Sequence, residues 1–232
     1  MKQFVKSLSR FGVEINFAMD SGVSFGGLNI SQARKPLADR SSAALHHCQT
    51  LGAKTILDVG SGGGHHASAF AAKGGQVTCI DFGTSVYAQE KGHAPGIELV
   101  EVDFLHWQSP KTFDLVWASH VLEHQRNPGQ FIDKLISLCA PKGHVAIIVP
   151  TPHRRLWGGH LTLWTPGLLA YNIVMAGIDL SDCVLEYGYR ETWLVFQPSR
   201  FKMPDITYDK GDINLLSPFF PKNFKEDADS WF

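Results

Sequence analysis

The stretch ILDVGSGGGHH, residues 56–66, joins an apolar run and an aspartate to four glycines within five residues. Thr55–Val59 predicts a short buried strand, and HHASAFAA at 65–72 predicts a helix directly after the glycines. Glycine lacks a Cβ, so it permits left-handed backbone and lets a ligand approach the chain closely. The stretch therefore predicts a strand, a ligand-binding loop and a helix in succession.

The same alternation continues along the chain as far as residue 150. Four further strands are expected at Gln76–Asp81, 97–103, 113–118 and 144–149. Helices are expected at 84–91, with Thr84 as its N-cap, and from Pro128, with Asn127 as its N-cap and Pro141-Lys142-Gly143 as its stop. Short, nearly all-apolar strands that alternate with helices predict an α/β fold, in which a doubly wound, mostly parallel sheet is covered on both faces.

The alternation of strands and helices ends after Pro150. Residues 151–165 are rich in Pro, Gly, Trp, His and Arg and predict a loop, and Thr165-Pro166 then predicts a helix that Gly177 ends. Strands at 182–187 and 191–197, joined by Gly188-Tyr189-Arg190, predict an antiparallel hairpin. Three parts are expected: an irregular N-terminal cap segment at 1–40 with a glycine-rich patch at 22–27, a main domain at 41–200, and a polar, proline-broken surface tail at 201–232.

Composition narrows the class of protein. The 232 residues carry a formal net charge of −1, with 44 % hydrophobic and 19 % charged residues, so no basic field indicates a nucleic-acid partner. No apolar run reaches the roughly 18 residues of a membrane span, and no leader peptide is expected. The four cysteines form no C-x-x-C pair and predict reduced thiols in a cytoplasmic protein. They are Cys48, Cys79, Cys139 and Cys183.

The glycine loop is compatible with several classes of ligand. A triphosphate loop requires Lys-Ser/Thr after its last glycine, which is absent here. Gly62, Gly64 and Ala67 satisfy the dinucleotide pattern G-x-G-x-x-A, so an NAD(P)-dependent oxidoreductase stays open. The glycines also fit a tight strand-to-helix turn with no ligand. An aspartate beside the loop disfavours a pyrophosphate and favours a ligand with a cationic group.

Asp58, Gly60, Gly62 and Gly64 form D-x-G-x-G-x-G, which resembles the loop of class I S-adenosylmethionine-dependent methyltransferases. FDLVWASHVLEH at 113–124 and LCAPKGHVAIIV at 138–149 resemble later motifs of the small-molecule branch of this family, and the resemblance covers roughly residues 40–197. It implies S-adenosylmethionine as cofactor and a seven-stranded, mostly parallel sheet with an antiparallel seventh strand. A protein that binds S-adenosylmethionine without catalysis remains an alternative.

The resemblance also implies the residues that hold the cofactor. Asp58 and nearby carbonyls would accept from the ammonium group, Asp81 from the ribose hydroxyls and Asp103 from the adenine amino group, while Phe104 packs against the adenine ring. The full expected set is Asp58, Gly60, Ser61, Gly62, Gly64, Asp81, Phe82, Asp103, Phe104, Ser119 and His120.

His120-Val121-Leu122-Glu123-His124 matches the zinc pattern H-x-x-E-H. That pattern needs a helix to align both histidines and a third ligand, whereas here a strand leads directly into His120 and Pro128 follows soon after. We therefore expect no metal, and we expect His120 beside the methyl-transfer centre as a catalytic residue. His65 and His66 are expected to serve packing.

The acceptor is expected in the loop 151–165. Arg154 and Arg155 could hold a carboxylate or phosphate, and Trp157 and Trp164 could face a ring. His160 resembles in position the loop histidine that acts as base or metal ligand in some quinone- and phenol-type O-methyltransferases, so it is expected to be catalytic and O-methylation is favoured. The chain lacks the [DNS]-P-P-[YFW] motif of DNA amino-methyltransferases. The partner expected is a small-molecule acceptor; a plain surface loop remains possible, and oligomeric state is left open.

Overall fold

The computed structural model describes residues 15–18, 22–25, 28–29, 41–84, 96–188 and 190–222, which fall into two compact units, 1–42 and 43–232. The first unit holds an antiparallel sheet of β1 (Ile15–Ala18), β2 (Gly22–Phe25) and β3 (Leu28–Asn29). The expectation of irregular structure before residue 40 is corrected by these strands. Their runs are too short for hydrophobic alternation to reveal them.

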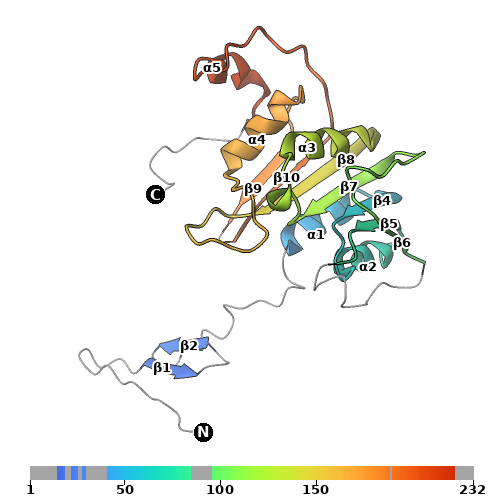
Figure 1. Cartoon of the computed structure of the whole chain (residues 1–232), viewed down its shortest axis with the longest axis vertical. Helices are drawn as coiled ribbons and strands as arrows, with labels where there is room; N and C mark the ends of the chain where they lie inside the picture. The colour runs from blue at the N-terminus through green and yellow to red at the C-terminus, as the bar shows by residue number, and fades with distance from the viewer. Residues whose placement is uncertain are drawn as a thin grey trace. The chain divides into compact units, whose positions relative to one another are not determined.

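The second unit is built on a seven-stranded sheet in the order β6-β5-β4-β7-β8-β10-β9 (Figure 1). The strands are β4 (Thr55–Val59), β5 (Gln76–Asp81), β6 (Glu98–Glu101), β7 (Phe113–Ser119), β8 (Cys139–Pro150), β9 (Val184–Tyr187) and β10 (Glu191–Phe196). The first five strands in this order are parallel, and β10 runs antiparallel to both its neighbours. The chain order reverses beside β4, and ligands of such sheets bind at the carboxyl ends of the strands flanking this point.

Helices cover both faces of this sheet. They are α1 (Ser42–Thr50), α2 (His65–Ala71), α3 (Pro128–Ser137), α4 (Pro166–Met175) and α5 (Asp212–Leu216). Alternate residues of β7 point to opposite faces: Val116 and Ala118 join the core under α3 and α4, and Leu115 and Trp117 join the core under α1 and α2. Burial on both faces explains why these strands read as continuous apolar runs.

Most predicted elements are confirmed, with local differences at their ends. β4 and β5 have the predicted bounds, while β6 is shorter than 97–103. β8 begins at Cys139 instead of 144, because Cys139 pairs with Phe113 across an irregularity in the register. Pro141-Lys142-Gly143 therefore lies inside the strand. Of the helix expected at 84–91, all residues after Thr84 lie outside the described ranges.

The residues at the N-cap positions of α3 and α4 differ in whether their side chains cap the helix. At α4 the Thr165 hydroxyl accepts a hydrogen bond from the Leu168 amide at 3.0 Å, and Gly177 adopts φ 80° after the helix, both as predicted. Asn127 occupies the N-cap position of α3, but its side chain makes no capping bond within the described residues. Proline at the first helical position is common to both helices.

The segment after residue 200 is more than a surface tail. It contains α5 and the 3₁₀ turn η4 (Ser217–Phe219), and Leu216 is fully buried in the α3/α4 core. The Phe201 and Phe219 rings stack with centroids 3.7 Å apart. Residues 201–222 therefore belong to the packed unit. No helix within the described ranges is long and apolar enough to cross a bilayer.

Candidate functional site

The glycine loop leaves the carboxyl end of β4 and enters α2. Gly60, Gly62 and Gly64 adopt φ values of 72°, 50° and 75°, a region that disfavours residues with a Cβ. The Gly60 amide donates to the Ile80 carbonyl at 2.7 Å, which ties the loop to β5. A Cβ on Gly60 would lie 2.2 Å from Cγ2 of Val121. The loops after β4 and β7 are thus in direct contact, as the fold requires for one shared site.

Asp81 is the last residue of β5, and its carboxylate faces this loop. Oδ2 accepts the Gly62 amide and Oδ1 accepts the Gly83 amide, both at 2.9 Å. The adjacent Phe82 is 60 % exposed, so its ring is available for contact with a ligand. An acid, an exposed ring and bare backbone therefore meet at this edge of the sheet.

Asp58 lies deeper, on the α2 face of β4, and is 2 % exposed. Burial is the main cause that raises the pKa of this carboxyl to about 7; the charge of Asp81 raises it further, and a hydrogen bond from the Ala67 amide opposes the rise. Among the described residues its Oδ2 has no hydrogen-bond partner. The group therefore holds a proton up to neutral pH, and a cation close to it would favour ionisation.

Asp103 and Phe104 follow β6 and point in different directions. The Asp103 carboxylate accepts the Leu105 amide at 2.9 Å and lies 2.8 Å from Nδ1 of His106. The Phe104 ring is 5 % exposed and packs edge-on against Phe131 in the core. The carboxylate therefore lies at the sheet edge, while the ring belongs to the α3/α4 core.

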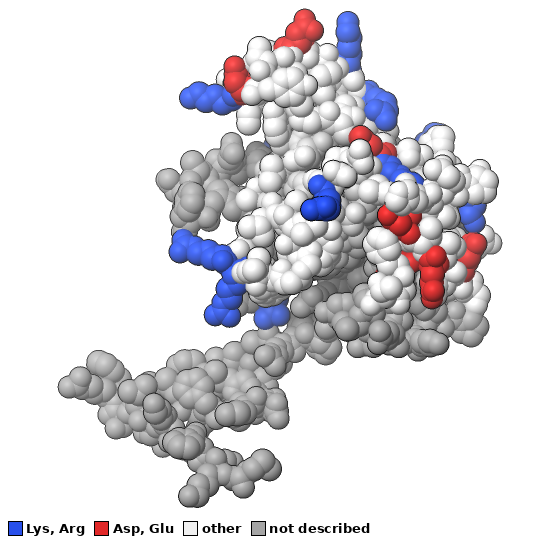
Figure 2. All heavy atoms as spheres, viewed as in Figure 1, with Lys and Arg blue, Asp and Glu red and all other residues white. Residues whose placement is uncertain are grey.

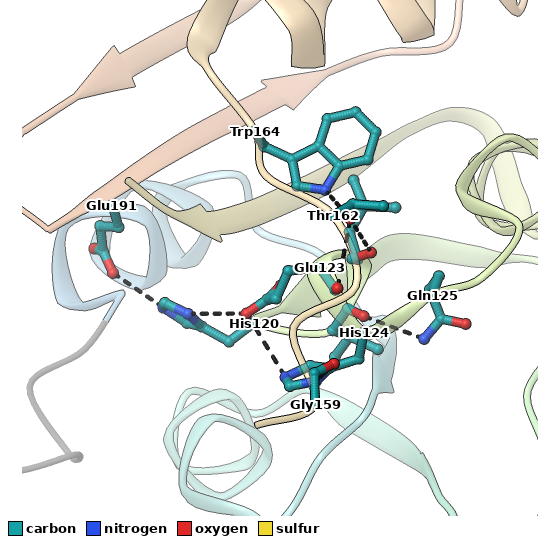
Figure 3. Close-up of polar contacts among 10 residues, drawn as sticks. His120, Glu123, His124, Gln125, Gly159, Thr162, Trp164 and Glu191 are labelled. Atoms are coloured by element: carbon teal, nitrogen blue, oxygen red, sulfur yellow. Dashed lines mark hydrogen bonds and ion pairs between the residues drawn. The ribbon is translucent and has the colours of Figure 1, made fainter. Parts of the chain in front are cut away.

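Ser119 is the last residue of β7, and His120 follows it. His120 adopts a left-handed backbone conformation, φ 56°, which is strained for a residue with a Cβ. Its Nδ1 lies 3.5 Å from Oε1 of Glu123, and its Nε2 lies 3.4 Å from Oε2 of Glu191 at the start of β10 (Figure 3). Burial of the imidazole disfavours its cation, but the nearby carboxylates of Glu123 and Glu191 outweigh burial and raise the pKa of His120.

The turn after β7 is bound to the loop 151–165. The Leu161 and Thr162 amides donate to the Glu123 carbonyl at 2.7 and 3.1 Å, and Nδ1 of His124 lies 2.7 Å from the Gly159 carbonyl oxygen. The ring centroids of His124 and His160 are 4.9 Å apart. His160 is therefore adjacent to the turn that carries His120, as a shared site requires.

The remaining predicted acceptor residues separate into two groups. Arg154, Arg155 and Trp157 are exposed, and Trp157 belongs to a ring cluster with His153 and His160. Trp164 is 3 % exposed in the core, where its indole N–H donates to the Thr162 hydroxyl at 2.8 Å. Its indole thus lies apart from that cluster. His66 packs edge-on against Trp117, as expected for a packing residue.

Sequence reasoning missed Glu123 and Glu191 as site residues. Glu123 stands inside the H-x-x-E-H pattern, but only its neighbours were weighed as ligands. Glu191 had no local signal, because 71 positions separate it from His120. Within the described ranges, Glu123, His124 and His160 are the group that could hold a metal ion, with one ligand atom from each and all three atoms within 4.8 Å of one another.

Residues 30–190 match a family model described as a methyltransferase domain. The chain belongs to this methyltransferase-domain family. The match spans the glycine loop, the turn after β7, the loop 151–165 and β9, and it ends just before β10. The resemblance expected from the sequence motifs is confirmed, as is the doubly wound fold with its antiparallel β10.

Curated relatives of this methyltransferase domain include ubiquinone biosynthesis O-methyltransferases from several organisms. The one from Idiomarina loihiensis is 27 % identical over 133 residues, covering 52 % of this chain and 55 % of the relative. The one from Paracidovorax citrulli is 37 % identical over 102 residues, covering 41 % of this chain and 43 % of the relative. The chain spans about half the length of the curated relatives it matches.

Solved structures share the methyltransferase fold at low identity. The 1,6-didemethyltoxoflavin-N1-methyltransferase of Burkholderia thailandensis, solved with S-adenosylhomocysteine, aligns with TM-score 0.55 and 23 % identity over 68 % of this chain and 77 % of its own. A complex of DhpI with S-adenosylhomocysteine aligns with TM-score 0.55 and 17 % identity over 72 % of this chain and 90 % of its own. At these identities the likeness concerns the fold.

Proposed function

We propose that the chain transfers a methyl group from S-adenosylmethionine to a small-molecule acceptor. The observation that carries the proposal is the left-handed glycine loop bound to the Asp81 carboxylate at the switch point of the sheet. Family membership supports it, and so do the relatives named as O-methyltransferases and the solved neighbours that hold S-adenosylhomocysteine.

Each polar group at the carboxyl-end edge of the sheet has a role in holding the cofactor. Asp81 uses one lone pair of each oxygen for backbone amides and keeps the others for the ribose hydroxyls. The exposed Phe82 ring covers one face of the adenine, and Asp103 accepts its amino group. Asp58 accepts the ammonium group through Oδ2, and Ser119 and His120 line the sulfonium side.

The acceptor lies against the loop 151–165, held by Arg154, Arg155 and Trp157, with His160 and His120 as the groups that handle its proton. Methyl transfer is an in-line displacement, so alignment supplies much of the rate, and a base is required when the acceptor is a hydroxyl. Burial is the main cause that lowers the pKa of His160, which keeps its imidazole neutral and able to accept a proton at pH 7. The names of the relatives support O-methylation.

Surface charge supports a small molecule over a nucleic acid as partner. On the face shown in Figure 2, both basic and acidic side chains occur and much of the described surface carries neither. The formal net charge is −1, far from the basic field that binds phosphate backbones. All four cysteines are free, which supports a cytoplasmic location.

Calorimetry with S-adenosylmethionine, S-adenosylhomocysteine and NAD in parallel tests the cofactor. Asp81→Ala should weaken S-adenosylhomocysteine binding by about ten- to a hundredfold, because it removes charge-assisted hydrogen bonds worth roughly 1.5–3 kcal/mol. Asp133→Ala, on the exposed face of α3, is the matched control and should bind as the parent does. Binding of NAD in place of S-adenosylmethionine would favour the oxidoreductase alternative.

Turnover tests the second half of the proposal. The parent is incubated with S-adenosylmethionine and a panel of phenols, catechols, hydroxyquinones and carboxylic acids, and S-adenosylhomocysteine formation is followed. Acceptor-dependent product that Asp81→Ala reduces supports methyl transfer. Tight cofactor binding with no turnover across hydroxyl, amine and carboxylate acceptors would favour a binding protein without catalysis.

A further inference from the structure

We propose that Lys134, a partly buried residue of α3, is a positioning residue for the adenine ring of the cofactor. Lys134 fixes the turn 103–107 after β6 and, through the backbone of Leu105, sets the direction of the Asp103 carboxylate. The inference rests on the proposed S-adenosylmethionine site, in which Asp103 accepts the 6-amino group of adenine. It adds a determinant of cofactor specificity that lies on a helix and outside the motifs of the sheet edge.

The Lys134 ammonium is bound to the backbone of this turn. Its Nζ donates to the Leu105 carbonyl oxygen at 2.9 Å and also to the Trp107 carbonyl oxygen, which lie 29 and 27 positions earlier in the chain. The same Nζ lies 5.2 Å from the centroid of the Phe104 ring. An ammonium group has three donors and no acceptor, so two of its three donors are used on this turn.

The turn pairs its own amides and leaves these two carbonyls to Lys134. The His106 and Trp107 amides donate to the Asp103 carbonyl oxygen at 2.9 and 3.0 Å, and the Leu105 amide donates to Oδ1 of Asp103 at 2.9 Å. Leu105 and Trp107 are partly buried. A carbonyl that is withdrawn from water and has no donor destabilises the folded backbone, so the turn depends on Lys134 for its geometry.

Leu105 connects Lys134 to the Asp103 carboxylate. Its N–H donates to Oδ1 of Asp103, while its C=O accepts from Lys134, so the backbone of Leu105 is held at both polar groups. The other carboxylate oxygen, Oδ2, lies 2.8 Å from Nδ1 of His106 in the same turn. Each oxygen keeps a further lone pair, and the direction of these lone pairs follows from the geometry of the turn.

The helix α3 gives the turn a rigid support. Phe131 and Lys134 are three positions apart, so they share one face of the helix. The Phe131 ring is fully buried and meets the Phe104 ring edge-on with centroids 5.1 Å apart, while Lys134 lies near the same ring. Asp103 directly precedes Phe104 and is therefore next to a residue that α3 holds at two points. A site supported by a packed helix is held more exactly than one supported by a loop.

The partners of Lys134 indicate a role in backbone geometry. Within the described ranges Lys134 forms no ion pair, and its hydrogen-bond acceptors are carbonyl oxygens. Burial is the main cause that lowers the pKa of Lys134, and the charge of Asp103 acts in the opposite direction. A lysine that served only to balance charge would have a carboxylate as its direct partner. Lys134 is instead joined to the acid through the backbone between them.

A fixed Asp103 would select the base of the cofactor. A carboxylate accepts a hydrogen bond from the 6-amino group of adenine and repels the 6-carbonyl oxygen of hypoxanthine. Discrimination of this kind depends on a polar group whose direction is fixed before the ligand binds. If the turn 103–107 loosens, the carboxylate can rotate away, and the preference for the amino group decreases.

The test compares S-adenosylhomocysteine with S-inosylhomocysteine, in which a carbonyl oxygen replaces the 6-amino group. In calorimetry with the full chain, the parent should bind S-adenosylhomocysteine at least about tenfold more tightly. Lys134→Met keeps the aliphatic stem and loses the donors. It should weaken S-adenosylhomocysteine binding by about tenfold and change S-inosylhomocysteine binding less than about threefold, whereas a residue that only stabilised the fold would affect both ligands alike.

Lys111→Met is the matched control for loss of a lysine beside a ring. Lys111 is exposed, and its Nζ lies 5.3 Å from the centroid of the Phe113 ring at the start of β7. This variant should keep both affinities of the parent. Lys134→Gln, whose shorter side chain cannot span both carbonyls, replaces Lys134→Met if that variant shows no thermal unfolding transition.

Asp103→Ala tests whether Lys134 acts through the carboxylate. In this background Lys134→Met should change S-adenosylhomocysteine affinity less than about twofold, because the group that Lys134 positions is gone. A tenfold loss in both backgrounds, an unchanged ratio of the two affinities in Lys134→Met, or a parent that binds both ligands equally well overturns the positioning role. A parent that binds neither ligand refutes the proposed cofactor site itself, so the two failures are distinguishable.

Discussion

Asp58→Asn should stabilise the ligand-free protein at alkaline pH. The pKa of Asp58 is raised from its ordinary value of 3.8 to about 7, chiefly by burial. Below pH 3.8 both the folded and the unfolded chain carry the proton, and ionisation costs no stability. Between pH 3.8 and 7 the unfolded chain ionises while the folded chain keeps the proton, so stability falls as pH rises and levels off above pH 7.

The size of this effect follows from the same rise. About three pH units at about 1.36 kcal/mol each give an upper limit of about 4 kcal/mol at pH 8. Local relaxation reduces that cost, so we expect Asp58→Asn to raise the free energy of unfolding at pH 8 by about 2 kcal/mol. For a domain of this size this raises the thermal midpoint by about 4–8 °C. Asparagine has the same shape, stays neutral at every pH and keeps an oxygen to accept the Ala67 amide.

Asp58→Asn should also weaken cofactor binding. If the ammonium group of S-adenosylhomocysteine binds the ionised carboxylate, Asp58→Asn should lower affinity by about tenfold or more. Binding to the parent below pH 7 should release a proton, and this release should vanish in Asp58→Asn. The variant is therefore expected to be more stable without ligand and less stabilised by it.

Thermal scans from about pH 4.5 to 8.5, with and without S-adenosylhomocysteine, measure both effects. Calorimetry in buffers of different ionisation enthalpy measures the proton release. Asp133→Asn, on the surface of α3, controls for loss of one negative charge. The reasoning is refuted if Asp58→Asn is less stable than the parent at pH 8, or if it binds S-adenosylhomocysteine equally well.

Three further variants test the loop contacts, the acceptor loop and the core. Gly60→Ala places a methyl group 2.2 Å from the Val121 side chain at a residue with φ 72°, so it should lower the free energy of unfolding by about 1–3 kcal/mol and weaken S-adenosylhomocysteine binding. Val121→Ala should restore part of both losses, and a thermal midpoint equal to the parent's would contradict the contact. His160→Ala should lower methyl transfer by about a hundredfold and change S-adenosylmethionine affinity less than about threefold, as measured by turnover and calorimetry; equal loss of both would place His160 against the cofactor. Phe131→Ala removes a fully buried ring between α3 and the sheet and should cost about 3–5 kcal/mol in urea unfolding; a cost below about 1 kcal/mol would show that the core collapses around the gap.

Sequence alone predicted most strands of the seven-stranded sheet, the helices α2, α3 and α4, and the sheet edge at which the glycine loop lies. β4, β5 and β7 are continuous apolar runs because both faces of the sheet are covered, and such runs are visible locally. The carboxyl ends of parallel strands share one edge, so the sequence pattern places the loop glycines and Asp81 together.

Pairing between distant segments decided the elements that sequence missed. Cys139 extends β8 because Phe113 offers it a partner across the sheet, which no window around residue 139 contains. Leu216 lies in a polar, proline-rich stretch, yet it is buried because the segment folds back on the α3/α4 core. Trp164 was expected in the acceptor site and lies in the core, since burial depends on what packs above a residue.

The histidine and glutamate cluster was decided by tertiary structure in the same way. The spacing of His120 and His124 is a local property, and the strand before His120 and the proline after the turn led us to expect no helical metal pair. The inward turn of Glu123, the carbonyl behind His124 and the approach of His160 depend on contacts between β7, the loop 151–165 and β10. Side-chain direction at the end of a strand follows from the turn geometry that those contacts stabilise, and a periodic pattern carries no information about it.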